Sequence, residues 1–202
     1  MSKNLIIVFT RNPELGKVKT RLAKTIGDKS ALNIYKFLLE HTEKTIRNID
    51  SDKAVYYSFK IRDNDIWDNT IYQKKQQRGS DLGLRMLNAF ENGFSNNYEK
   101  IIIIGSDLLD LHTSHINEAF NKLDNRDVVI GPAEDGGYYL LGLKFIPPNI
   151  FSNKNWGTSS VLKDTLHDLI SLNVHLLKEL NDIDTFDDIQ ANSELKKFIN
   201  ND

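Results

Sequence analysis

Two nearly continuous apolar runs, residues 5–10 and 101–104, are each followed by turn-forming residues. Runs of this length that end in Arg-Asn-Pro or Gly-Ser-Asp are typical of buried strands leading into loops. Alternating or short β-rich segments predict further strands at residues 53–59, 127–130, 138–143 and 174–177, and allow a short one at 71–73.

Longer amphipathic stretches lie between these strands. A long helix is expected after Asp28, which we interpret as its N-cap, with an apolar face formed by Leu32, Tyr35, Leu38, Leu39, Thr42, Ile46 and Ile49. Other helices are expected at 81–94, 112–123, 158–171 (capped by Thr158 or Ser159), and after Thr185, where Ile189, Leu195 and Phe198 are apolar.

Strands that alternate with helices predict an α/β fold with three layers, α/β/α, in which helices cover both faces of a mainly parallel sheet. No repeat or linker divides the chain, so we expect a single domain over 1–202. Such sheets bind ligands at the carboxyl ends of their strands. The loops to consider are therefore 11–21, 78–81, 105–111 and 131–137.

Composition narrows the function classes. The chain has 202 residues, of which 26 are basic and 28 acidic, and neither half is strongly basic, so binding to long nucleic acid is not indicated. The lack of cysteine excludes disulfides, a thiolate nucleophile and a cysteine zinc site. His112 and His115 have no evident third ligand for zinc. The apolar run near the N-terminus is too short for a signal peptide or a membrane span, so a cytoplasmic location is expected.

The loop after the first strand is rich in cations. Arg11, Lys17, Lys19 and Arg21 surround Gly16, and they could gather a triphosphate at the start of a helix, although a solvated basic loop would look the same. The Walker pattern requires glycine where Arg11 stands and Ser or Thr where Val18 stands, so this loop is not a P-loop. A Rossmann glycine motif is also absent.

Two aspartates are candidate metal ligands. Asp107 follows the strand at 101–104, where a carboxylate can bind Mg²⁺ together with substrate phosphates, or can cap the next turn. Asp184 lies in Asn-Asp-Ile-Asp-Thr, and it or Thr185 could instead cap the last helix. This segment is not a phosphatase nucleophile loop, because Phe186 stands where such a loop has Thr or Val, and because the segment lies far from the first strand in the sequence.

Two further features are ambiguous. Gly136 and Gly137 suggest either a backbone close to a ligand or a tight hairpin. Trp156, followed by Gly-Thr-Ser, is either a pocket wall or a core residue.

Several motifs in order resemble a known family: Phe-Thr-Arg-Asn-Pro-Glu-Leu-Gly-Lys-Val-Lys-Thr-Arg-Leu-Ala at 9–23, Arg-Gly-Ser-Asp-Leu-Gly-Leu-Arg-Met at 78–86, Gly-Ser-Asp at 105–107, Gly-Pro-Ala-Glu-Asp-Gly-Gly-Tyr-Tyr at 131–139, Trp-Gly-Thr-Ser-Ser-Val-Leu at 156–162 and Asp-Ile-Asp-Thr at 182–185. They resemble the radical-SAM/selenodomain-associated, glycosyltransferase-like family of the nucleotide-diphospho-sugar transferase superfamily. This family is similar to the guanylyltransferases that act on phospholactate. The resemblance implies a GT-A-like fold.

The resemblance also implies roles for individual residues. The phosphates of a nucleotide would be bound by Arg11, Gly16, Lys17, Lys19, Arg21, Gly79 and Asp81, with Lys19, Arg21 and Asp107 catalytic. Asp107 and Asp184 would hold Mg²⁺ or Mn²⁺. The acceptor would bind to segments 60–80 and 131–157, with Asp135, Gly136, Gly137 and Trp156 as its candidate contacts. Relatives often have proline where this chain has Leu109, which alters the turn after Asp107.

Two chemistries fit these residues. Nucleotidyl transfer needs cations around a triphosphate and a metal ion. Glycosyl transfer from a nucleotide sugar usually uses an Asp-x-Asp motif. That motif is absent around Asp107, because Gly105 stands two residues before it and Leu109 two residues after it. We therefore favour nucleotidyl transfer to a phosphorylated or other small acceptor, with a glycosyltransferase and a non-catalytic nucleotide-binding protein as alternatives.

Overall fold

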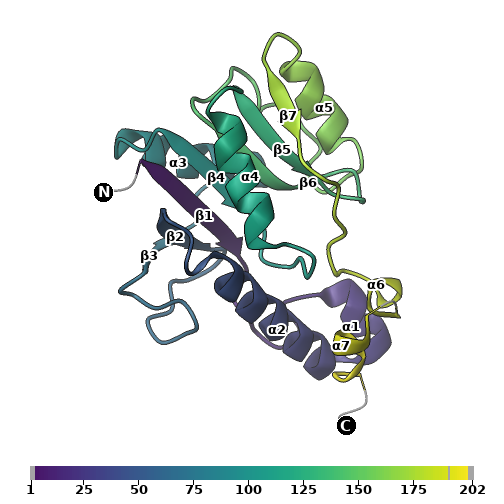
Figure 1. Cartoon of the computed structure of the whole chain (residues 1–202). Coiled ribbons are helices and arrows are strands. Elements are labelled where there is room, and N and C mark those ends of the chain that lie inside the picture. The colour runs from purple at the N-terminus through teal and green to yellow at the C-terminus, as the bar shows by residue number, and fades with distance from the viewer. Residues whose placement is uncertain (1–2, 191, 200–202) are drawn as a thin grey trace.

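The computed structural model describes residues 3–190 and 192–199, so the ends of the predicted domain 1–202 lie outside the described residues. Its sheet has seven strands in the order β3-β2-β1-β4-β6-β5-β7 (Figure 1). The strands are β1 (Asn4–Thr10), β2 (Asp52–Tyr57), β3 (Tyr72–Gln76), β4 (Lys100–Ile104), β5 (Val128–Pro132), β6 (Tyr138–Leu143) and β7 (Val174–Leu176).

The sheet is mixed and mostly parallel. Strand β6 is the exception, because it runs antiparallel to both β4 and β5. Only residues 133–137 separate β5 from β6, and a connection this short can form a hairpin but not the crossover that a parallel pair needs. The predicted three-layer arrangement is confirmed, and helices cover both faces of the sheet (Figure 1).

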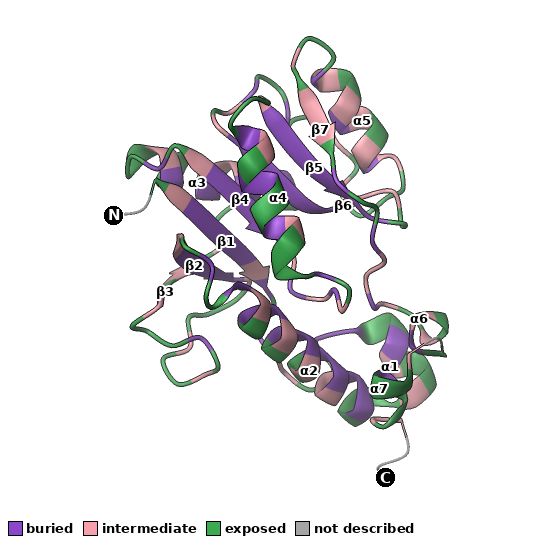
Figure 2. Ribbon diagram, in the orientation of Figure 1, coloured by how far each residue is buried: buried purple, intermediate pink, exposed green. Residues whose placement is uncertain are grey.

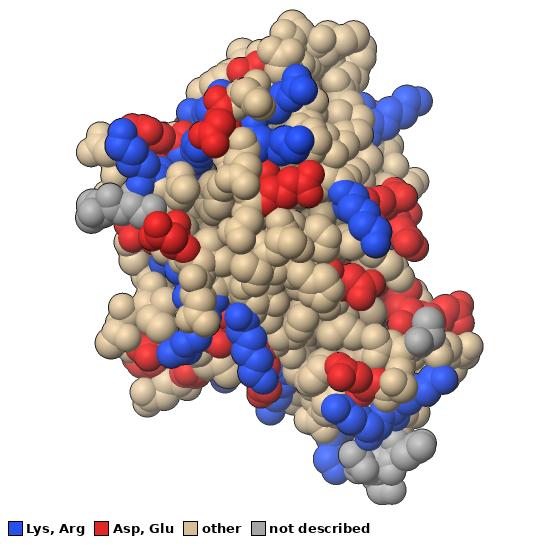
Figure 3. Space-filling view, in the orientation of Figure 1, with Lys and Arg blue, Asp and Glu red and all other residues tan. Residues whose placement is uncertain are grey.

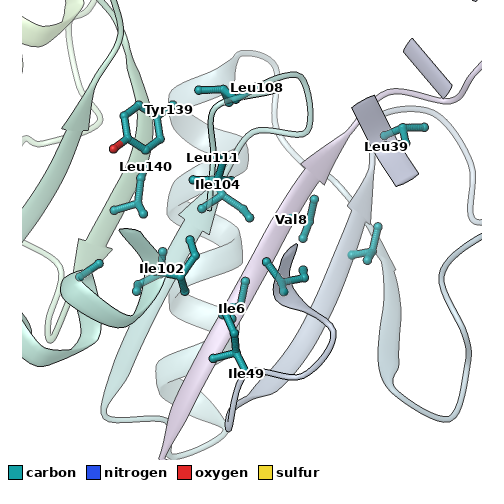
Figure 4. Close-up of a cluster of buried hydrophobic side chains, with 14 of the residues drawn as sticks. Ile6, Val8, Leu39, Ile49, Ile102, Ile104, Leu108, Leu111, Tyr139 and Leu140 are labelled. Atoms are coloured by element: carbon teal, nitrogen blue, oxygen red, sulfur yellow. The ribbon is translucent and has the colours of Figure 1, made fainter. Parts of the chain in front are cut away.

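The central strands supply side chains to both faces. In β1, Ile6 and Val8 contact the layer formed by α2 (Asp28–Ile46) and α4 (Thr113–Leu123), whereas Ile7 contacts the layer of α3 (Leu82–Ser95) and α5 (Val161–Asp168). This is the period-two alternation of a strand that is buried on both sides. Figure 4 shows Ile6 and Val8 in the first of these layers, and Figure 2 shows the central strands as buried.

Three predicted helix boundaries differ from the structure. Helix α2 begins after Gly27, which is the N-cap in place of Asp28. Helix α5 begins after Ser160, one or two residues later than expected. The helix predicted after Thr185 is instead two short ones, α6 (Phe186–Gln190) and α7 (Ser193–Lys196), because Asn192 caps a new start by accepting hydrogen bonds from the amides of Glu194 and Leu195. Residue 191 lies outside the described residues.

A third apolar cluster ties the two ends of the chain together. Leu22 of α1 (Thr20–Ile26) packs with α2 and with Ile183, Ile189 and Leu195 near the C-terminus. Figure 1 accordingly shows α1, α6 and α7 side by side, in the purple and yellow of the two chain ends. This packing places the segment around Asp184 next to the basic loop after β1.

Two further global features are the surface charge and the hydropathy of the helices. On the face drawn in Figure 3, basic and acidic side chains are interspersed. Among the described residues, no helix combines the length and the apolar character that crossing a membrane requires.

Candidate functional site

A cleft of about 1000 Å³ opens at the carboxyl ends of β1 and β4. Its walls come from the loop after β1, from residues 105–107 after β4, from the first turn of α3 and from the segment before α6. Of the predicted nucleotide ligands, the cleft is lined by Arg11, Lys17, Lys19 and Arg21, together with both candidate metal ligands, Asp107 and Asp184.

Ion pairs join these side chains across the cleft. The Nζ of Lys19 lies 2.9 Å from Oδ2 of Asp107 and 3.9 Å from Oδ1 of Asp184. A guanidinium nitrogen of Arg21 lies 3.1 Å from Oδ2 of Asp184. One nitrogen is close to both carboxylates, so the two carboxylates are less than about 10 Å apart. Carboxylates farther apart than that could not share one metal ion.

Lys19 is not the exposed loop cation that the sequence suggests. Only 5% of its side chain is exposed, compared with 72% for Arg21. Burial alone would lower the pKa of Lys19, but the charges of Asp107 and Asp184 and the hydrogen bond to Asp107 outweigh it and raise the pKa. Lys19 is therefore a buried ammonium ion whose charge is balanced by the two carboxylates.

The backbone of Lys19 is also unusual. Its φ of 47° and ψ of 45° are left-handed values, which non-glycine residues adopt rarely and at a cost of about 1–3 kcal/mol. The carbonyl of Lys19 accepts the first hydrogen bond of α1 from the amide of Ala23, at 2.8 Å. Lys19 thus turns the chain from the loop into α1 and directs its own side chain inward.

The segment before α6 is attached to the loop after β4 through its backbone. The amide of Ile183 donates to the carbonyl of Asp107 at 3.1 Å, and the buried side chain of Ile183 packs against α2. Asp182 and Asp184, on either side of Ile183, both line the cleft. Burial, and then the charge of Asp107, raises the pKa of Asp182 to about 6.

Sequence reasoning did not single out Asp182 as a site residue. The sequence did contain a signal for it, because Ile183 is a single apolar residue between two acidic ones. Alternate residues of an extended segment face opposite sides, so a buried Ile183 places Asp182 and Asp184 on the same, opposite side. Thr185 stands directly before α6, where the sequence offered it as a cap; its amide and hydroxyl donate to Oδ2 of Asp188, as the amide of Asp184 also does. Asp188 is the acceptor that fixes this turn.

A buried hydroxyl joins the ends of the two central strands. The Tyr35 oxygen lies 3.1 Å from Oγ1 of Thr10 and 3.3 Å from Oγ of Ser106. It also accepts from the amide of Arg11 at 2.9 Å. Burial raises the pKa of Tyr35, so the group stays neutral. The sequence identified Tyr35 only as a core residue of α2, because its polar partners are remote in sequence.

Three of the predicted nucleotide ligands, Asp81, Gly79 and Gly16, have contacts or backbone angles that serve the fold. Asp81 caps α3 by accepting from the amide of Leu84 at 2.9 Å. Gly79 has a φ of 139°, and a side chain there would collide with the first turn of α3. Gly16 has a φ of 69°, and like Gly79 and Asp81 it does not line the cleft. Arg85, which the sequence did not single out, does line it, and its Nε donates to the carbonyl of Gly79.

A second cavity of about 170 Å³ adjoins the cleft. Three of the predicted acceptor contacts, Asp135, Gly137 and Trp156, line it, and we name it the acceptor cavity after that prediction. Gly136 does not line it, because its φ of 87° and its closeness to the backbone of Ser159 give it a turn role. Of residues 60–80, which were also expected to bind the acceptor, only Gln77 lines either cavity, and it lines the main cleft.

Comparison with known proteins agrees with this geometry. The chain is 31% identical to a provisionally assigned nucleotide-diphospho-sugar transferase from Desulfovibrio desulfuricans G20, whose crystal structure superposes with a TM-score of 0.87 and covers 98% of this chain and 91% of that one. The 4-diphosphocytidyl-2C-methyl-D-erythritol synthase of Anaerococcus prevotii shares the fold, with a TM-score of 0.61, 13% identity and 96% coverage of both chains.

Sequence relatives point to the same superfamily. The chain is 26% identical over 144 residues to a 2-phospho-L-lactate guanylyltransferase from Methanocaldococcus vulcanius; the match includes 69% of this chain and spans 61% of the length of that relative. The resemblance to phospholactate guanylyltransferases is thereby confirmed. A family model also matches residues 43–158. The chain therefore belongs to the bacterial family described as "Uncharacterized protein conserved in bacteria (DUF2064)" and has the fold of the nucleotide-diphospho-sugar transferases and nucleotidyltransferases.

Proposed function

We propose that the chain is a nucleotidyltransferase that moves a nucleoside monophosphate from a nucleoside triphosphate to a small acceptor. The observation that carries the proposal is the convergence, in one cleft, of four cations from the loop after β1 with Asp107 and Asp184. The names of its relatives, a guanylyltransferase and a cytidylyl-transferring synthase among them, support the same reaction class.

The exposed cations suit the phosphates of the nucleotide. Arg11, Lys17 and Arg21 are exposed and line the cleft. Their charged groups can therefore pair with phosphate oxygens without leaving a buried carboxylate unpaired. Lys19 differs because its ammonium group is buried and already paired with Asp107 and Asp184. It becomes available to phosphate only when Asp107 and Asp184 acquire another cation.

The donor set fits Mg²⁺ or Mn²⁺. Within residues 3–190 and 192–199, no three His, Cys, Asp or Glu side chains form a ready-made metal cage. Two carboxylates that already balance one ammonium ion do match the preference of Mg²⁺ for one or two carboxylates plus substrate phosphates. Asp107 and Asp184 would hold the ion, which when bound supplies positive charge at the triphosphate.

In the proposed reaction an acceptor oxygen attacks the α-phosphorus. The new oxygen–phosphorus bond replaces the bond to the bridging oxygen, pyrophosphate leaves with that electron pair, and any proton on the acceptor oxygen passes to solvent. The charge that develops on the triphosphate is stabilised by cations fixed before the reaction begins, which is the main way a protein accelerates such a step. Because nucleoside triphosphates are cytoplasmic, the proposal includes a cytoplasmic location.

Glycosyl transfer is the second candidate, favoured by the assignment of the 31% identical relative as a nucleotide-diphospho-sugar transferase. A screen of the four nucleoside triphosphates and common nucleotide sugars, with Mg²⁺ or Mn²⁺ and a panel of small acceptors, separates the two. Acceptor-dependent release of pyrophosphate supports the proposal. Release of a nucleoside diphosphate from a nucleotide sugar supports the alternative, and binding without either product indicates a non-catalytic protein.

A further inference from the structure

The acceptor cavity has a distinctive chemical lining. Aromatic and aliphatic side chains line it together with three carboxylates, those of Asp107, Asp135 and Asp182. Among the described residues, no Lys, Arg or His lines this cavity. A phosphorylated or carboxylated group placed here would meet only negative charge.

The basic residues are all on the other side of the site. Arg11, Lys17, Lys19, Arg21 and Arg85 line the main cleft and not the acceptor cavity. The two spaces meet at six residues that line both, namely Leu82, Gly105, Asp107, Asp135, Gly157 and Asp182. Positive side chains are thus confined to the main cleft, whereas the carboxylates of Asp107, Asp135 and Asp182 line both spaces, so the charged side chains that line the acceptor cavity are all negative.

One carboxylate of the cavity is held by the backbone. Oδ1 of Asp135 accepts from the amide of Gly137 at 2.8 Å, so this negative charge has little freedom to move away from a bound ligand. The main chain that carries Asp182 is attached nearby, because the amide of Leu180 donates to the carbonyl of Pro132 at the end of β5 at 3.1 Å.

The aromatic wall is also built in. Trp156 lies against Gly83 in the first turn of α3, where an added Cβ would be only 2.6 Å from the indole ring. Only glycine allows the ring to lie so close to the helix. Trp156 is therefore fixed as a wall of the cavity by a residue of another element.

We infer that the acceptor carries a positively charged ammonium group, which binds between Asp135, Asp182 and the ring of Trp156. The inference rests on the proposed function and specifies its acceptor. Aromatic faces and fixed carboxylates both attract an organic cation, and the same carboxylates exclude an anion of equal shape. The cavity volume of about 170 Å³ resembles that of a cavity of ~150 Å³ that accommodates benzene, so the group that enters is small. The nucleophilic oxygen of the acceptor would face the main cleft.

The test uses three probes of one shape and different charge: choline, its neutral carbon isostere 3,3-dimethylbutan-1-ol, and the anion 3,3-dimethylbutanoate. Each is titrated into ¹⁵N-labelled full-length protein at a fixed magnesium concentration, following the amide signals of Gly137 and Gly157. We expect choline to bind about tenfold more tightly than the neutral isostere, which is the size of a partly desolvated cation–aromatic contact, and the anion not to bind.

Variants test which carboxylates are responsible. Asp135→Asn and Asp182→Asn should each reduce the preference for choline over the alcohol, whereas Glu134→Gln, an exposed acidic neighbour that lines neither cavity, should leave it unchanged. Circular dichroism confirms that each variant is folded. Equal or tighter binding of the alcohol or the anion to the wild type, or no binding of any probe, overturns the inference. Nucleoside triphosphate binding to the wild type is measured under the same conditions, and its absence would count against the proposed function instead.

Discussion

The Nζ of Lys19 lies 2.9 Å from Oδ2 of Asp107, although 88 positions separate the two residues in the sequence. The contact joins the loop after β1 to the loop after β4, and it places a buried positive charge where the proposed function requires a divalent one. On the proposed function, a metal ion would therefore compete with Lys19 for the same carboxylates. The first two predictions follow from this competition.

Replacing Lys19 with methionine should increase the affinity of the nucleotide-free protein for Mn²⁺. Methionine fills similar space but leaves Asp107 and Asp184 without their internal cation, so an ion no longer has to displace it. The Mn²⁺ dissociation constant, measured by electron paramagnetic resonance, should fall, while the affinity for nucleoside triphosphate decreases. An unchanged Mn²⁺ affinity in a folded variant would show that Lys19 and the metal use different sites.

Asp107→Asn should abolish metal-dependent turnover while the protein still folds. The amide keeps the shape of the side chain but removes the charge that would hold a hard cation. It also leaves the buried Lys19 with the more distant Asp184 alone, so we expect the free energy of unfolding to fall by about 1–3 kcal/mol. The matched control is Asp110→Asn, an exposed change in the same loop. Wild-type rate and metal dependence in Asp107→Asn would remove this residue from the mechanism.

Arg21→Ala should weaken nucleotide binding without destabilising the fold. The side chain is 72% exposed, so its ion pair with Asp184 contributes no more than about 1 kcal/mol to stability. A lost charge-assisted phosphate contact should cost on the order of 1.5–3 kcal/mol of binding free energy. Calorimetry of nucleotide binding beside thermal melts checks both values. Lys24→Ala, an exposed cation on the same helix outside the cleft, should change neither.

Tyr35→Phe should lower the free energy of unfolding by about 1–3 kcal/mol, because it removes a buried hydroxyl that accepts from the amide of Arg11 and hydrogen-bonds to Thr10 and Ser106. Urea denaturation measures the change. Since the hydroxyl also holds Thr10 and Arg11 at the end of β1, nucleotide affinity should decrease as well. Wild-type stability in this variant would mean that water replaces the hydroxyl at no cost.

Asp188→Asn should alter how stability depends on pH. Burial acts to raise the pKa of Asp188, but hydrogen bonds from Asn181, Thr185 and the amide of Asp184 outweigh it and lower the pKa. A lowered folded-state pKa means that the carboxylate stabilises the fold above its unfolded pKa of about 3.9, and that this contribution disappears as the pH falls through the folded value.

Denaturation at several pH values, in the presence of a chelator, checks this. The wild type should be more stable than Asp188→Asn at pH 7, and the difference should shrink toward pH 3. The exposed neighbour Asp187→Asn provides the control. A difference that stays constant with pH would assign the effect to shape and not to charge.

Much of the fold is predictable because it follows from local patterns. The run at residues 101–104 predicts β4, and Asp107 is placed at a strand end by that run alone. The direction of β6 was not among these predictions, although the short connection before it requires a hairpin. The Gly27 start of α2 was missed because Asp28, the preferred cap type, stands next to it.

The site is less predictable because its contacts are between distant segments. The loop of cations is visible in the sequence, but the burial of Lys19 depends on Asp107 and Asp184, which only the folded chain brings near. The roles of Tyr35 and Asp182 are hidden for the same reason. Asp81 and Gly79 show a further limit, since the sequence alone does not separate a ligand contact from a residue that shapes the turn at the start of a helix.

The way α1 packs against the last helices has a consequence for biosynthesis. A ribosome releases Lys19 and Arg21 long before Asp184 and the α6–α7 segment that covers Leu22. A nascent chain can assemble the central strands first, but it then holds an ammonium group whose second carboxylate has not yet been made. The cleft is therefore completed only after the α6–α7 segment has emerged, so on the proposed function a nascent chain without that segment is not expected to capture nucleotide.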